Sequence, residues 1–266
     1  MNSPINTTMN APIHARIALI CLVIIALSAC ASSRVIDPAK QASLANIHYR
    51  LGIDALGKQG MLPKAFHELI KSNEILPDQP EVLDALAYAW LLRGDMKKSE
   101  TFYLRAIRNH AGAATYNNYA NLLNRLHRHK EAEKAARQAL DDPRYPNQDL
   151  AFINLGDALA GQKKFKPAIA AYQEAMAFNP NNSIINLRMA DAYASQGKLR
   201  EARALYEMIF HKQQGNRVIV EGLLAVLKQQ QDTIAAKTIL NQFRQHTKAV
   251  LDKAWAENEL ERIDTP

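Results

Sequence analysis

The stretch INLGDALAGQKKFKPAIAAYQEAMAFNP, residues 153–180, decides the fold. Within it Ala168 follows Gly156 by twelve residues, and Tyr172 and Pro180 come later. Two small residues at this spacing fit two antiparallel helices whose backbones touch, with large side chains filling the space around the contact. The proline then stops the second helix, because it lacks the backbone donor that the next turn needs. The stretch therefore predicts a helical hairpin.

The hairpin recurs at intervals of about 34 residues on both sides of this stretch. The first small residue of each hairpin, numbered position 8 here, is Gly52, Ala87, Ala120, Gly156 and Ala190 in successive units. The second, at position 20, is Ala65, Ser99, Ala132, Ala168, Ala202 and Ala236. The last unit carries Leu223-Leu224 where the fifth has Met189-Ala190. These spacings resemble the tetratricopeptide repeat, and they predict six units from residue 46 to residue 250.

No single unit can bury its apolar face alone, so successive hairpins must stack and share one core. The sequence thus predicts an all-α fold, a right-handed superhelical α-solenoid of six repeats with a C-terminal capping helix. Gly60, Gly94 and Gly197 stand where first helices end, which is typical of a left-handed cap. Pro77 and Pro180 are expected to stop second helices.

Two departures from the repeat mark the ends of segments. The insert DDPRYPNQD, residues 141–149, lengthens the connection between the third and fourth units. After the last unit, KAVLDKAWAENELERI places Val250 with Ala254 and Leu251 with Trp255 at helical spacing. We expect residues 251–266 to form a helix and tail that cover the final apolar face.

The first thirty residues have the layout of a secretory signal. Arg16 is the single charge before an apolar run from Ile17 to Ala26, and small residues precede Cys30. The run is too short to cross a bilayer, which needs about 20 residues, although an uncleaved anchor is the alternative. Residues 1–29 are therefore predicted to be a signal peptide, and residues 30–45 a tether to the repeats.

Leu27-Ser28-Ala29-Cys30 resembles a bacterial lipobox. The resemblance implies cleavage before Cys30 and a covalent lipid on its sulfur, which would be the lipid attachment site. Ala31, where an aspartate would imply retention at the inner membrane, implies the outer membrane of a Gram-negative bacterium. The other cysteine, Cys21, leaves with the signal, so no disulfide or cysteine-based metal site is expected.

Composition limits the classes of function. The formal net charge is +7, but basic and acidic residues are interspersed, whereas a nucleic-acid binder usually carries a basic stripe. No glycine-rich phosphate loop and no hydrolase or zinc-protease motif occurs in the sequence. His127 and His129 are expected to be exposed turn residues. We therefore expect neither an enzyme nor a cofactor, metal or small-molecule substrate.

Stacked helix pairs curve, and their first helices line the concave side. With helices 8–10 Å apart, six units form a groove on the order of 50 Å long, which accommodates roughly 15 extended residues. Asparagine side chains carry both donors and acceptors, so they suit a partner's backbone. Solvated polar surface is the alternative reading. The predicted partner-binding residues are Asp84, Tyr88, Asn117, Asn118, Asn121, Asp157 and Asp191.

The middle of the chain resembles the lipoproteins of type IV pilus biogenesis and stability, the pilotins of the pilus secretin. The likeness rests on Asn117-Asn118-Tyr119, Tyr145-Pro146 and Asn154-Leu155-Gly156 together with the lipobox. It implies an outer-membrane adaptor whose groove binds secretin subunits and promotes their localisation and multimerisation, hence pilus biogenesis and twitching motility. One alternative is another repeat lipoprotein that serves barrel assembly or scaffolds peptidoglycan hydrolases. A second is an envelope-tethered enzyme or enzyme regulator.

Overall fold

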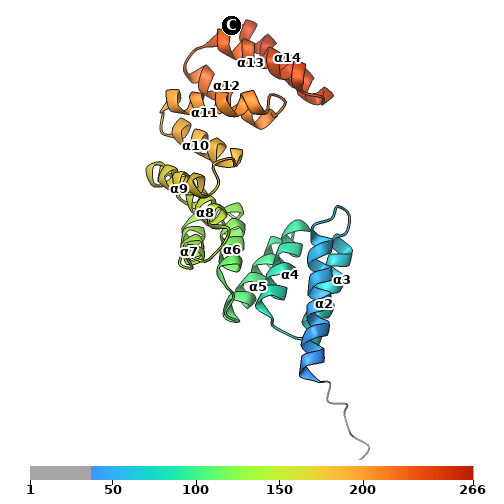
Figure 1. The fold of residues 1–266 in the computed structure, drawn as a ribbon. Coiled ribbons are helices and arrows are strands. Elements are labelled where there is room, and N and C mark those ends of the chain that lie inside the picture. The colour runs from blue at the N-terminus through green and yellow to red at the C-terminus, as the bar shows by residue number, and fades with distance from the viewer. Residues whose placement is uncertain (1–36, 266) are drawn as a thin grey trace, which may run out of the picture.

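The computed structural model describes residues 37–265, so the predicted signal peptide and Cys30 lie outside the described residues. The described chain is entirely helical and contains no strand. Its helices are α2 (Pro38–Leu56), α3 (Leu62–Ile75), α4 (Pro80–Leu92), α5 (Met96–Arg108), α6 (Ala113–Arg125), α7 (His129–Leu140), α8 (Gln148–Gly161), α9 (Phe165–Phe178), α10 (Ser183–Ser195), α11 (Leu199–Lys212), α12 (Arg217–Gln229), α13 (Thr233–His246) and α14 (Val250–Asp264). Figure 1 shows them stacked in chain order along a curved path, from α2 and α3 in blue to α13 and α14 in red.

The expected α-solenoid is confirmed, because each repeat forms one antiparallel pair from α2–α3 to α12–α13. Ala87, Ala120 and Ala190 at position 8 are fully buried, as are the small residues at position 20 in units one to five. At Gly156 the approach is closest: an added Cβ would lie 2.3 Å from Cε1 of Tyr172. A shared apolar core then runs through the stack, with one cluster extending from Ala87 to Ala192.

The left-handed cap is more general than the glycines indicate. Gly60, Gly94 and Gly197 have φ of 76°, 88° and 75°. The corresponding residues of the other three units are His127, Lys163 and Gln231, and they adopt φ of 57°, 61° and 58°. The first helices of units two to six therefore end in the same backbone conformation, at some steric cost in the three units that lack glycine. In unit one α2 ends at Leu56 with Gly57 as a right-handed C-cap, so Gly60 lies in the following turn and does not cap the helix.

The helix α2 begins earlier than expected, so residues 38–45 of the expected tether are helical. Asp37 is the N-cap, since its carboxylate accepts a hydrogen bond of 3.0 Å from the backbone N–H of Ala39. Pro38 occupies the first turn, where a missing N–H costs nothing. The Asp-Pro pair is thus a helix start that the repeat register alone does not reveal.

The capping helix is present as α14, but its buried face differs from the expected one. Val250 and Leu251 are 79% and 81% exposed. The buried face begins a turn later, where Ala256 is fully buried. The ring of Trp255 packs edge-on against the ring of Phe243, with 5.6 Å between the ring centroids. Within residues 37–265, no helix has both the length and the apolar character needed to cross a bilayer.

The close contact at Gly156 yields a stability prediction. We expect Gly156→Ala to lower the free energy of unfolding by about 1–3 kcal/mol, because the new methyl group overlaps the Tyr172 ring. Urea denaturation followed by circular dichroism measures the change. The control is Gly57→Ala, whose Cβ would make an ordinary contact of 3.7 Å, so its effect should stay within about 0.5 kcal/mol. Equal effects of the two substitutions would contradict the prediction.

Candidate partner-binding groove

The first helices of units two to five line a groove that contains two adjoining hollows. One, of about 370 Å³, lies over α4, α6 and α8, and the other, of about 460 Å³, lies over α6, α8 and α10. They share Asn121, Arg125, Asp157 and Arg188, so together they form one continuous surface. Six of the seven predicted partner-binding residues line it, namely Tyr88, Asn117, Asn118, Asn121, Asp157 and Asp191.

The seventh predicted residue, Asp84, does not line either hollow. Asn118 donates through Nδ2 to both carboxylate oxygens of Asp84, at 3.2 and 3.1 Å, and so links α6 to α4. Burial raises the pKa of Asp84, and hydrogen bonds from Asn118 and Thr115 oppose that shift. Asp84 therefore positions Asn118, which lines the smaller hollow.

Asn117 also has a different role from the expected one, because its side chain is only 5% exposed. Asn154 of α8 donates through Nδ2 to Oδ1 of Asn117 at 2.8 Å and to its backbone carbonyl at 3.2 Å. Asn124 donates in turn to the backbone carbonyl of Asn154 at 2.9 Å. The asparagine cluster thus joins α6 to α8, and the amide group of Asn117 is used inside the protein.

Acidic residues at position 9 of units four and five are held by tyrosines of the paired second helices. Tyr172 donates its hydroxyl to Oδ1 of Asp157 at 2.8 Å, and Tyr206 donates to Asp191. Burial raises the pKa of Asp157 above its ordinary value. The positive charge of Arg188, whose Nε lies 3.1 Å from Oδ1 of Asp157, opposes part of that rise. Arg188 is 44% exposed and presents its remaining donors to the groove.

Unit two lacks this arrangement, because its position 9 is Tyr88 in place of an aspartate. The tyrosine equivalent to Tyr172 is Tyr103, which is fully buried and lines the smaller hollow. Its hydroxyl has no hydrogen-bond partner among residues 37–265. The hydroxyl of Tyr103 is therefore a buried donor beneath the groove that no described side chain uses.

The groove also has an apolar edge that the sequence reading missed. Position 2 of units four, five and six carries Leu150, Ile184 and Val218, which are 43%, 52% and 61% exposed. Leu150 and Ile184 line the smaller hollow, and Val218 continues the row on α12 beyond both hollows. Exposed aliphatic residues are ordinary singly, but three at one position of successive repeats form a row. The three residues can be found in the sequence by aligning the six units and comparing position 2. The groove thus combines an apolar edge with a polar floor.

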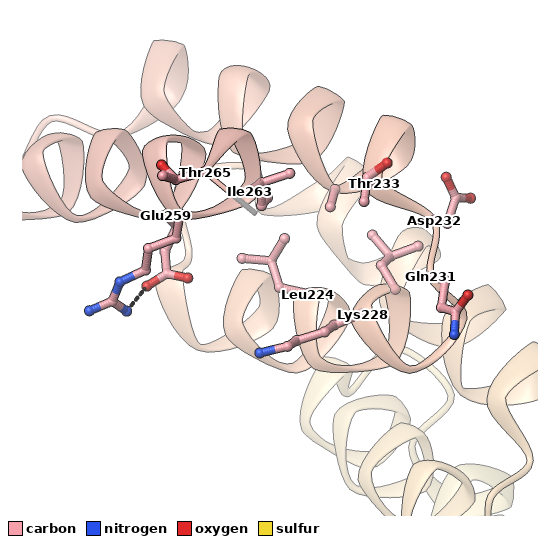
Figure 2. Close-up of a pocket in the computed structure, with 11 residues that line it drawn as sticks. Leu224, Lys228, Gln231, Asp232, Thr233, Glu259, Ile263 and Thr265 are labelled. Carbon is pink, nitrogen blue, oxygen red and sulfur yellow. Dashed lines mark hydrogen bonds and ion pairs between the residues drawn. The ribbon is translucent and has the colours of Figure 1, made fainter.

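A further hollow of about 430 Å³ lies outside this groove, between α12 and α14 (Figure 2). Leu224 and Lys228 border it on one side, and Glu259 and Ile263 on the other. Leu224 occupies position 8, which is Gly or Ala in the other five units, and α12 and α13 pack less closely than the other pairs. The larger side chain accounts for this gap in the stack.

The fold and the groove define an interaction protein built from tetratricopeptide repeats. A family model described as tetratricopeptide repeat matches residues 64–114 and 120–183, and a second with the same description matches residues 159–227. The chain is therefore a tetratricopeptide repeat protein. Within residues 37–265, no group of histidine, cysteine and acidic residues is arranged to hold a metal ion.

Solved structures place the chain near two pilus proteins. PilF of Pseudomonas aeruginosa is 23% identical with a TM-score of 0.68, and the match covers 83% of this chain and 99% of PilF. PilW, described as a widely conserved type IV pilus biogenesis factor, is 20% identical with a TM-score of 0.73, covering 83% and 98%. A tetratricopeptide repeat protein from Parabacteroides merdae is 13% identical with a TM-score of 0.66, covering 84% and 87%. At these identities the likeness shows the fold. No curated protein sequence matches the chain significantly.

Removing the hydroxyl group should affect the free energy of unfolding differently at Tyr172 and at Tyr103. Tyr172→Phe removes the hydroxyl that donates to the partly buried carboxylate of Asp157, leaving only the ion pair with Arg188, and should lower the free energy of unfolding by about 1–3 kcal/mol. Tyr103→Phe removes a buried hydroxyl that has no protein partner and should change it by less than about 0.5 kcal/mol, or raise it. Parallel urea titrations compare the two variants. A loss at Tyr103 equal to that at Tyr172 would disprove the assignment.

Proposed function

We propose that this protein is a lipid-anchored adaptor of the outer membrane, facing the periplasm, that binds secretin subunits of the type IV pilus through its groove. In this role it is a pilotin that promotes secretin localisation and multimerisation, and hence pilus biogenesis and twitching motility. The main support is that the chain matches nearly the whole length of two pilus biogenesis proteins while keeping an open groove. The lipobox resemblance at Cys30 supports the anchor.

The apolar edge indicates the kind of segment that the groove accepts. Neighbouring helices lie about 8–10 Å apart, so Leu150, Ile184 and Val218 recur with that period. A polyproline II segment places every third side chain on one face at about 9 Å, which matches the row. We therefore expect the bound segment to be extended, with an apolar side chain at every third residue.

The polar floor suits the backbone of such a segment. An extended chain leaves its carbonyl groups free, because polyproline II has no internal hydrogen bonds. Arg188, which is 44% exposed and lines both hollows, can supply donors to such a segment. Asn121 adds an amide group whose Oδ1 accepts from Arg125 at 3.0 Å and whose Nδ2 donates to Asn154 at 3.4 Å. Affinity would come from the apolar row and orientation from these donors.

A charged residue in the apolar row tests groove binding. Ile184→Asp should reduce the secretin recovered with the protein from detergent extracts by at least about tenfold, because the new carboxylate would lose water on binding. The matched control is Ile234→Asp, since Ile234 is 81% exposed on α13 and lies outside both hollows. Quantitative immunoblotting measures recovery. Unchanged binding of Ile184→Asp, or recovery of barrel-assembly subunits or peptidoglycan hydrolases in place of secretin, would contradict the proposal.

The anchor has its own test. Cys30→Ser should abolish palmitate labelling and move the protein from the outer-membrane fraction to the soluble periplasm, because two or more acyl chains are needed for stable attachment. Secretin multimers in the outer membrane should fall with it, while binding in extracts persists. Normal multimers in cells that carry only the serine variant would refute the anchoring role.

A further inference from the structure

The first unit exposes positions that every other unit buries. At position 3, no residue of units two to six is more than 5% exposed, and at position 7 none is more than 8% exposed. These residues are Val82, Thr115, Ala151, Ile185 and Ile219, and Leu86, Tyr119, Leu155, Met189 and Leu223. Their counterparts in unit one, Ile47 and Leu51, are 51% and 41% exposed. The burial elsewhere comes from the preceding unit, and the described part of the chain contains no unit before unit one.

The helix α2 extends this exposed surface. It has 19 residues, whereas the first helices of the other units have 13 or 14, and the extra turns are at its N-terminal end. They add Leu44, which is 47% exposed, and the exposed Lys40. Lys40, Leu44, Ile47 and Leu51 follow one another at spacings of three or four residues, so they share one side of the helix. We call this surface the end face.

The position of the anchor identifies what the end face meets. Seven residues, 31–37, separate Cys30 from the start of α2, and they span at most about 25 Å when fully extended. A lipid on Cys30 therefore holds the N-terminal end of α2, where the end face begins, within that distance of the bilayer. We propose that the end face of α2 lies on the lipid surface to which Cys30 is anchored, and this rests on the proposed lipid anchor.

The chemistry of the end face fits the interfacial region of a bilayer. Its three aliphatic side chains would enter the boundary between headgroups and acyl chains, as an amphipathic helix does. Lys40 can place its aliphatic stem along that boundary and its ammonium group near lipid phosphates. Three half-exposed side chains hold a free protein weakly, but the tether raises the local concentration of lipid surface enough to favour contact. Docking should therefore require the tether.

Side-chain accessibility tests the docking directly. The chain from Cys30 to Pro266 contains every described helix and has Cys30 as its sole cysteine, so it can be coupled there to maleimide lipid in vesicles of phosphatidylethanolamine and phosphatidylglycerol. Hydroxyl-radical footprinting with mass spectrometry then measures oxidation of each side chain. Oxidation of Leu44, Ile47 and Leu51 should fall at least about threefold on coupling. Val250 and Leu251, exposed at the other end, should be unchanged.

A pair of variants and a set of alternatives complete the test. Leu51→Asp should restore oxidation of Leu44 and Ile47 on vesicles, whereas Leu251→Asp should leave their protection intact. Protection without vesicles would mean that a second copy covers the end face, and protection only after adding solubilised secretin would mean a protein partner; either result overturns the proposal, as does no protection. The chemical link supplies the tether, so missing palmitate labelling in cells would count against the proposed function and not against docking.

Discussion

The structure depends on how closely the two helices of each unit approach. Where position 8 is glycine, a side chain of the second helix occupies the space that a Cβ would need: Leu69 at Gly52 and Tyr172 at Gly156. Where position 8 is alanine, the methyl group is fully buried. This contact fixes the geometry of each hairpin, and repeated hairpins then share one apolar core. Unit six illustrates the dependence, since Leu224 at position 8 accompanies a looser α12–α13 pair and a hollow beside α14.

Close stacking also determines what the groove can present. First helices of adjacent units lie near enough for Asn154 to bond Asn117 across the boundary, and for Asn118 to bond Asp84. Polar side chains at these boundaries are used for register, while those one turn away face outward. Asp157 and Arg188 illustrate the second group, because the ion pair between them is partly exposed and borders both hollows. The groove is polar at its floor because one surface of the first helices carries both the side chains that align adjacent units and the side chains that face a partner.

The architecture could be predicted from the sequence because the same pattern of small and large residues occurs in six successive units. It predicted single positions less well where local signals were absent or ambiguous. The caps at Gly94 and Gly197 were predicted from their glycines, but His127, Lys163 and Gln231 adopt the same conformation without one, and Gly60 does not cap α2. Asn117 was assigned to the groove because helical spacing cannot distinguish a boundary residue from an outward one. The apolar row at Leu150, Ile184 and Val218 was not predicted, because single exposed aliphatic residues are ordinary and only their recurrence at position 2 distinguishes a row.

The two ends of the solenoid differ in how well their outermost helices are covered. At the C-terminal end α14 buries Ala256 and packs Trp255 against Phe243, so the last repeat is covered. At the N-terminal end no described helix precedes α2, and Leu44, Ile47 and Leu51 stay exposed there. Six units at about 8–10 Å each then extend the solenoid on the order of 50 Å beyond α2. On the proposed docking, the groove begins near the lipid surface and its apolar row, in units four to six, lies farther into the periplasm, where a partner chain is accessible before it enters the membrane.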